Sequence, residues 1–107
     1  MIHFGELLME IFNHYPQKNP DTASRTIDSE AVIVLPEKSQ VHTLNPVATR
    51  IWELADGQHK LSEIISTLEN EFDCPSDRIK SDSVEFVVTM IEQGLMRLAD
   101  QPDQSDG

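Results

Sequence analysis

Residues 41–57 constrain the fold most, because they predict a strand that turns directly into a buried helix. They read VHTLNPVATRIWELADG. The segment Val41–Leu44 contains β-branched residues, which favour a strand. Asn45 is a good helix N-cap, and Pro46 suits the first helical position, where a missing N–H costs nothing. Gly57 predicts the end of the helix, since glycine adopts the left-handed C′ conformation without strain.

The helix that begins at Pro46 carries a wide apolar stripe, which is typical of a helix buried on one side. The only tryptophan of the chain, Trp52, lies at its centre and is expected to be largely buried. The stripe consists of Val47, Ala48, Ile51, Trp52, Leu54 and Ala55. The two halves of the domain are therefore expected to meet at this helix.

Upstream of this stretch, short β-prone segments and polar turns predict an antiparallel meander. The strands are expected at residues 23–27, 31–35 and 40–44, with turns at 28–30 and 36–39. The middle segment, AVIVL, is apolar at every position, which predicts a central strand covered on both faces. The third segment is mixed in character, as expected of an edge strand.

Downstream, the spacing of apolar residues predicts two further helices. One runs from Leu61 to Phe72, and the other from Ser76 to Gln93, with Gly94 at its end. The sequence therefore predicts an α+β fold, in which a three-stranded antiparallel β-meander is followed by three helices. Two helices joined by a short turn and followed by residues 95–98 resemble a winged helix-turn-helix.

The last of these helices has more apolar residues than one buried stripe needs. One stripe contains Val84, Val87, Val88, Ile91 and Leu95, and a second contains Ile79, Phe86 and Met90. Either the helix is wedged between neighbours and buries both stripes, or part of the first stripe floors a groove. In the second case, the third strand would form the other wall of the groove.

The chain is expected to form one domain with extensions at both ends. Residues 1–18 are predicted to be an N-terminal arm, with a helical apolar spacing over residues 1–15 and linker-like composition from Pro16 to Thr22. The arm would dock on the core or support a homodimer. Residues 19–99 form the predicted domain, and the acidic residues 100–107 are expected to be disordered.

The charge balance limits the partners of the protein. Eight basic and 19 acidic residues give a net charge of −11, which argues against binding nucleic acid through its phosphates. This charge suits a basic or neutral partner, although acidity also serves solubility alone. No apolar run is long enough to span a membrane, and the N-terminus is a poor signal peptide. A single cysteine fits a reducing compartment, so the cytoplasm is expected.

No set of residues predicts catalysis, a metal site or a cofactor. The four histidines are scattered without ligand spacing, and Cys74 has no second cysteine to pair with. Binding is the function class that remains. An edge strand presents unpaired backbone N–H and C=O groups, with which an extended peptide can pair.

Three segments of the chain resemble the PqqD family. They are LNPVATRIWELADG, LSEIISTLENEFDCP and DSVEFVVTMIEQGLM, within residues 19–97. PqqD-like proteins, also called RiPP recognition elements, are small proteins without enzyme activity that present precursor peptides to modifying enzymes. The resemblance implies a precursor-peptide partner and a modifying enzyme of the radical SAM type. PQQ biosynthesis is the pathway from which the family is named.

The resemblance also implies a site, because in PqqD-like proteins a leader peptide adds a strand to the third strand and packs against the third helix. Carried onto this sequence, the strand positions are Gln40, Val41, His42, Thr43 and Leu44. The helix positions are Val84, Val88, Ile91 and Leu95.

Two other functions are compatible with the same elements. A winged helix could bind DNA, but its recognition helix, residues 77–93, offers only Arg78 and Lys80 against four carboxylates. The protein could also scaffold an enzyme without touching its substrate. A titration with a precursor peptide distinguishes this last function from leader binding.

Overall fold

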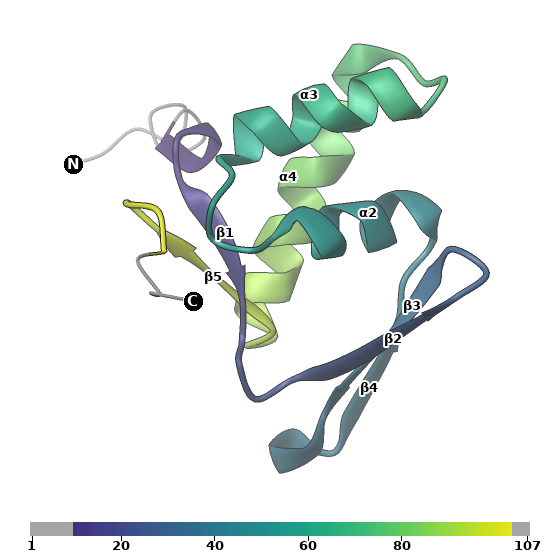
Figure 1. Cartoon of the computed structure of the whole chain (residues 1–107), viewed down its shortest axis with the longest axis vertical. Helices are drawn as coiled ribbons and strands as arrows, with labels where there is room; N and C mark the ends of the chain where they lie inside the picture. The colour runs from purple at the N-terminus through teal and green to yellow at the C-terminus, as the bar shows by residue number, and fades with distance from the viewer. Residues whose placement is uncertain (1–9, 104–107) are drawn as a thin grey trace.

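The computed structural model describes residues 10–103 and confirms the predicted α+β fold (Figure 1). Three helices lie on one side of a three-stranded sheet, and a separate two-stranded sheet packs beside the last of these helices. The elements are β1 (Tyr15–Lys18), β2 (Ala23–Ile27), β3 (Glu30–Leu35), the 3-10 turn η1 (Pro36–Lys38), β4 (Gln40–Thr43), α2 (Pro46–Leu54), α3 (Leu61–Glu71), α4 (Ser76–Glu92) and β5 (Met96–Ala99).

The predicted meander is confirmed as an antiparallel sheet in the order β2-β3-β4. Asp28 and Ser29 connect β2 to β3 with φ of 51° and 67°, a left-handed pair that matches the twist of a tight hairpin. Ser39, with φ of 52°, ends η1 and allows β4 to return along β3.

Strand β3 is central, but it is covered on one face only. Its side chains alternate, so that Ile33 and Leu35 are fully buried against the helices while Val32 and Val34 are half-buried on the outer face. The expectation of cover on both faces is therefore wrong. A continuous apolar run is ambiguous in this respect, because its composition does not say whether a second layer is present.

The start of α2 follows the prediction closely. The side chain of Asn45 accepts a hydrogen bond from the N–H of Ala48 at 2.8 Å, and Pro46 is the first helical residue. Trp52 is 2% exposed, which confirms its expected burial, and its Nε1 donates to the hydroxyl of Ser24 on β2 at 3.1 Å. Through Trp52, α2 is fixed to the sheet.

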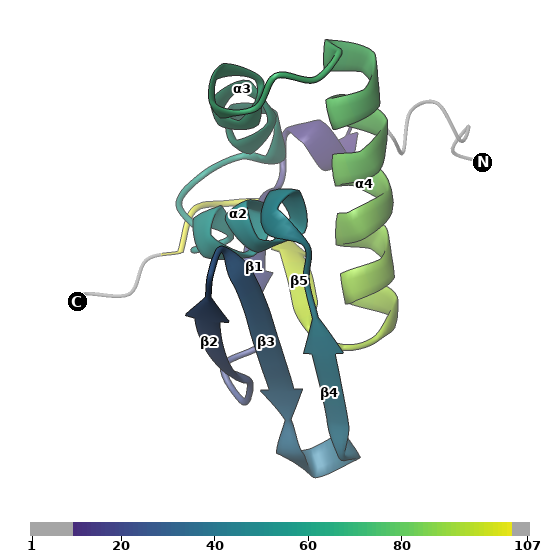
Figure 2. The ribbon, with the colours of Figure 1, turned by 90° about the vertical axis from the view of Figure 1, so that its right-hand side faces the viewer.

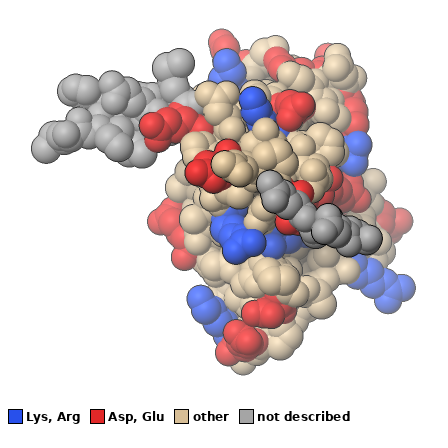
Figure 3. Space-filling model, turned by 60° about the vertical axis from the view of Figure 1, so that its left-hand side comes forward, with Lys and Arg blue, Asp and Glu red and all other residues tan. Residues whose placement is uncertain are grey.

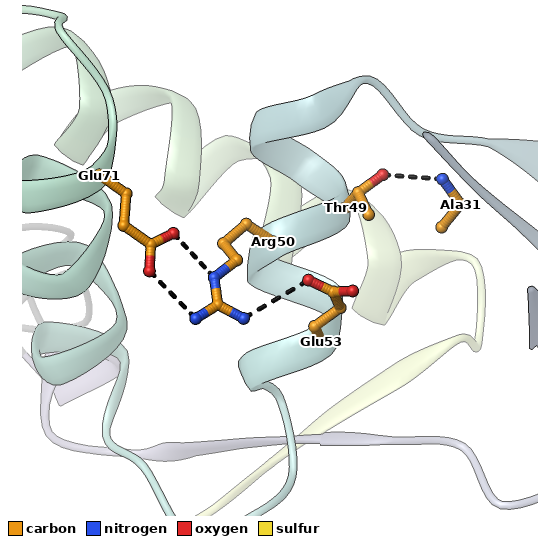
Figure 4. Close-up of polar contacts among 5 residues, drawn as sticks. All are labelled: Ala31, Thr49, Arg50, Glu53 and Glu71. Atoms are coloured by element: carbon orange, nitrogen blue, oxygen red, sulfur yellow. Dashed lines mark hydrogen bonds and ion pairs between the residues drawn. The ribbon is translucent and has the colours of Figure 1, made fainter. Parts of the chain in front are cut away.

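Helix α3 packs its predicted apolar face into the same core, with Leu61, Ile64, Ile65 and Leu68 all buried. Two bonds from the guanidinium of Arg50 on α2, at 2.8 and 3.0 Å, reach the carboxylate of Glu71 at the end of α3 (Figure 4). A paired contact of this kind fixes the orientation of both side chains. No described helix is long and apolar enough to cross a membrane.

Strand β1 was not predicted. Residues 15–18 fall in the expected arm and linker, yet they pair antiparallel with β5, and Pro16 and Gln17 are buried. The carbonyl of Pro16 accepts a hydrogen bond from the N–H of Gly57 at 3.0 Å. Proline has no N–H, so its carbonyl is the one backbone group with which it can form hydrogen bonds. Residues 15–18 of the expected arm therefore pair with a strand of the predicted domain, residues 19–99.

The two ends of the chain are described only in part. Residues 1–9 of the predicted N-terminal helix lie outside the described residues, and residues 10–12 are helical. Disorder was expected from Asp100, but the N–H of Asp103 donates to the carbonyl of Gly57 at 2.8 Å. Residues 104–107 lie outside the described part.

Candidate functional site

Strand β4 forms an edge of the sheet. It pairs with β3, and no described segment pairs with its other side. Figure 2 shows this open edge on the side of the sheet that is nearer to α4. An open edge offers backbone donors and acceptors at strand spacing, which is what an added peptide strand requires.

The register shows which backbone groups of β4 are open. The N–H of Leu44 donates to the carbonyl of Ala31 at 2.8 Å, in line with the antiparallel register of β3 and β4. Backbone groups alternate in direction along a strand, so those of His42 also point to β3. The N–H and C=O groups of Val41 and Thr43 therefore point away from the sheet. These two residues offer four backbone groups to a partner.

The predicted strand residues divide between two faces. Val41 is 66% exposed and lies with Thr43 on the outer face. Gln40 and His42 are half-buried on the face toward the helices, and their side chains are 3.0 Å apart. Leu44 is buried in the core, so its side chain is unavailable to a ligand.

Beyond the end of β4, a hollow of ≈ 590 Å³ opens between the first turns of α2 and one flank of α4. Its apolar lining consists of Val47, Ala48, Ile51, Ile79 and Phe86. Its polar lining consists of Asn45, Cys74, Arg78, Asp82, Glu85 and Thr89. Asn45 follows β4 after a single intervening residue, so the hollow continues the line of the open edge.

The buried line of α4 combines members of both stripes that the sequence indicated. It consists of Ile79, Ser83, Val87 and Met90. Phe86 lies on one flank of this line and Val88 on the other, about 160° apart at 100° per residue. Val84 and Ile91 lie on the same flank as Val88, and the side chain of Val88 is 38% exposed. The hollow is thus lined by the flank opposite to the one that the sequence favoured.

Leu95 was expected at the end of the binding stripe, but it is fully buried in the core. Helix α4 ends at Glu92, and Gly94 turns the chain with φ of 78°. Leu95 therefore no longer follows the helical period on which its assignment rested. Asn19 holds this turn, because its N–H bonds to the carbonyl of Leu95 at 2.9 Å and its side chain to that of Gly94 at 2.8 Å.

The charged groups in the hollow all come from α4. Nε of Arg78 lies 3.6 Å from a carboxylate oxygen of Asp82, one turn further along the helix. Glu85 makes no ion pair with any described residue. On the face drawn in Figure 3, acidic groups are spread widely and a few basic groups lie near the middle, in keeping with the net charge of −11.

Phe86 and its polar neighbours, which line the hollow, were not among the predicted site residues. A signal for them was present, because a strand that continues into an N-capped helix places the first turn of that helix beside the strand's end. The flank of α4 that faces this first turn then borders the site. Among the described residues, no group of three or more His, Cys, Asp or Glu side chains is placed to hold a metal.

Comparisons with known proteins agree with this architecture. A PqqA binding protein of Xanthomonas campestris pv. campestris strain B100 is 34% identical over 67 residues, which is 63% of this chain and 71% of that protein. The PqqA binding protein of strain 8004 is 33% identical over the same shares.

Two solved structures share the fold. TbiB1 in complex with the TbiA(beta) leader peptide matches with a TM-score of 0.69 and 21% identity, over 76% of this chain and 94% of that one. Lasso peptide synthetase B1 complexed with the leader peptide matches with a TM-score of 0.67 and 20% identity, over 78% and 98%.

The family model described as coenzyme PQQ synthesis protein D (PqqD) matches residues 30–96. This range extends from β3 to the start of β5 and includes both the open edge and the hollow. It is more than half of the chain, and it confirms the resemblance that the sequence motifs indicated. The chain belongs to the PqqD family.

Proposed function

We propose that this protein binds the leader segment of a ribosomally made precursor peptide, of the PqqA type, and presents it to a modifying enzyme. The observation that carries the proposal is the open edge of β4, which leads directly into an apolar hollow. Membership of the PqqD family supports it, as do relatives that are PqqA binding proteins. This is a binding function without catalysis.

The peptide would extend the sheet as a strand beside β4. Its backbone would pair with the outward N–H and C=O groups of Val41 and Thr43, which supplies affinity without regard to sequence. Alternate side chains of the peptide would face the helices, next to Gln40 and His42. Those peptide side chains that lie near the end of β4 would enter the hollow. Their burial against Phe86 would contribute about 25 cal/mol per Å² of buried apolar area to the binding free energy.

The helical contacts are proposed on the flank of α4 that lines the hollow. They would come from Asp82, Glu85, Phe86 and Thr89. Val84, Val88 and Ile91, the helix positions implied by the family resemblance, lie across the buried line from this hollow. We therefore assign them a different partner.

We propose that this second flank supports a homodimer together with the N-terminal arm. The first described residues run past it, since Nζ of Lys80 lies 5.8 Å from the ring centre of Phe12, and Lys80 is one turn before Val84. Val88→Glu would then dissociate the dimer in a sedimentation experiment and leave peptide affinity unchanged. A wild-type protein that sediments as a monomer at high concentration would contradict this proposal.

The modifying enzyme is proposed to be of the radical SAM type, acting in the cytoplasm. Pairing at β4 fixes only the leader, so the remainder of the precursor stays available to the enzyme. A mixture of this protein, precursor and enzyme should form a ternary complex, and binding of enzyme and peptide at the same surface would contradict presentation.

Proline substitutions at the two sheet edges test peptide binding. Thr43→Pro removes an outward N–H of β4, whereas Thr26→Pro removes an outward N–H of β2, the opposite edge, by the same alternation. With a fluorescein-labelled PqqA peptide, Thr43→Pro should weaken binding by about 1 kcal/mol, roughly fivefold. Thr26→Pro should have no effect. Equal effects of the two substitutions, with both variants folded by circular dichroism, would contradict strand addition at β4.

Two alternative functions predict other results. A DNA-binding winged helix would show salt-sensitive affinity for duplex DNA. The hollow is lined by two carboxylates and one guanidinium, and this excess of negative charge opposes binding to phosphates. A scaffolding subunit would bind the enzyme without binding the peptide. The titration above and an anisotropy titration with duplex DNA distinguish these functions from leader binding.

A further inference from the structure

We infer that the hollow selects a peptide with a basic residue close to its apolar anchor, and that Glu85 receives this basic group. The inference rests on the proposed function and specifies the chemistry of the ligand. It follows from the unequal distribution of charge around an apolar floor. The apolar floor of the hollow selects the anchor. The rim, which consists of Arg78, Asp82 and Glu85, selects the basic residue.

The floor accepts one large apolar side chain. The accessible apolar surface of the floor comes from Val47, Ala48 and Phe86, which are half-buried, while Ile51 and Ile79 support them from the core at 1% and 3% exposure. Half-buried apolar groups on a well-packed base offer a fixed surface to a ligand. An aliphatic or aromatic side chain of the peptide would be the anchor.

The rim carries an unbalanced negative charge. Arg78 is engaged with Asp82 on its own helix, which leaves Glu85 without a cationic partner among the described residues. Glu85 is exposed and lines the hollow together with Phe86, so its carboxylate is accessible to a ligand that occupies the anchor position. Lys38 approaches α4 at Gly94, more than two turns further along, and does not neutralise Glu85.

Strand geometry specifies where the basic residue lies in the peptide. Side chains two residues apart point to the same face and are about 7 Å apart along a strand. A lysine or arginine two positions from the anchor would therefore face α4 with the anchor. Its long side chain would reach Glu85 while its stem covers apolar surface. The net charge of −11 favours the approach of such a peptide.

A selection from a displayed library of short random peptides tests the inference. Wild-type protein should enrich peptides that carry Lys or Arg within two positions of an apolar anchor. Glu85→Lys should reverse this preference toward Asp or Glu. Glu69→Gln, which removes an exposed carboxylate on α3 away from the hollow, should leave it unchanged. An unchanged preference for Lys or Arg in Glu85→Lys would overturn the inference.

Titrations with the most enriched peptide give the second measurement. Glu85→Gln should weaken binding two- to fivefold, roughly the effect of an exposed ion pair, and the difference should disappear at about 1 M salt. Wild-type affinity in Glu85→Gln at low salt would overturn the inference and leave the proposed function intact. If wild-type protein enriches no peptide and binds no PqqA peptide, the proposed function itself fails.

Discussion

The hydroxyl of Thr49 accepts a hydrogen bond from the N–H of Ala31 at 2.8 Å, where the β3–β4 ladder ends (Figure 4). The same hydroxyl donates to the carbonyl of Leu44 at 3.3 Å. A side chain of α2 thus takes the place of a direct backbone bond between the two strands. Through this bridge β4 separates from β3 and continues into α2, which places the hollow at the end of the open edge.

Removal of this bridge should destabilise the domain. Thr49→Val keeps the shape of the side chain but leaves the buried N–H of Ala31 without a partner, which costs about 1–3 kcal/mol. Thr67→Val is the matched control, because the hydroxyl of Thr67 donates to the carbonyl of Glu63 at an exposed position. The measurement is the free energy of unfolding in urea. Equal losses in both variants would show that the bridge has no special role.

The two described glycines with positive φ should differ in their response to alanine. Gly57 and Gly94 have φ of 79° and 78°, so alanine is strained at both, by roughly 1 kcal/mol. At Gly57 a Cβ would also approach the side chains of Gln17 and Asp103 at 2.9 Å, whereas at Gly94 it would meet only the mobile end of Lys38 at 3.0 Å. Gly57→Ala should therefore lower the unfolding free energy more than Gly94→Ala. The opposite order would contradict the packing of β1 against this turn.

Much of this fold was predictable from local patterns. The meander follows from polar turns between β-prone segments, and α2 follows from Asn45 and Pro46. The prediction placed Gly57 at the C′ position, but the structure places it three residues beyond α2, where it allows β1 to approach closely. Local patterns do not reveal contacts of this kind between distant segments.

The elements that were missed depend on tertiary partners. Residues 15–18 have the composition of a linker, and they form a strand because β5, some 80 residues later, supplies the pairing. For a similar reason, the sequence did not indicate which flank of α4 lines the hollow. Helix α4 has more apolar residues than one buried line needs. Which of them are buried is decided only by its packing against α2, α3 and β5. The open edge of β4 was predictable, because the mixed polar and apolar residues of an edge strand are visible in the sequence itself.

Acid should weaken the contact between α2 and α3. The hydrogen bond and charge of Arg50 hold the pKa of Glu71 below its ordinary value of 4.5. Because the folded pKa is depressed, the stabilisation is complete above pH 4.5 and is lost as pH falls through the folded pKa. Glu71→Gln should lower Tm near pH 7, and its difference from wild type should shrink below pH 4.5. Glu69→Gln, on the same helix, should show no such convergence.

The buried hydroxyl of Ser83 has no hydrogen-bond partner among the described residues. Ser83 lies on the core line of α4 and is fully buried. Ser83→Ala should raise the unfolding free energy by about 0.5–1 kcal/mol, because it removes a desolvated polar group and improves helix propensity. The same substitution at the exposed Ser81 gives the propensity effect alone. A loss of stability in Ser83→Ala would indicate a partner for this hydroxyl.

The central claim is that a leader peptide adds a strand to β4 and inserts side chains into the hollow at its end. Amide chemical-shift mapping of the labelled protein with a PqqA peptide tests both parts together. Perturbations are expected at Val41 and Thr43 and along the flank of α4 that contains Phe86. Perturbations that cluster instead on α3, or on the turn between β2 and β3, would contradict it.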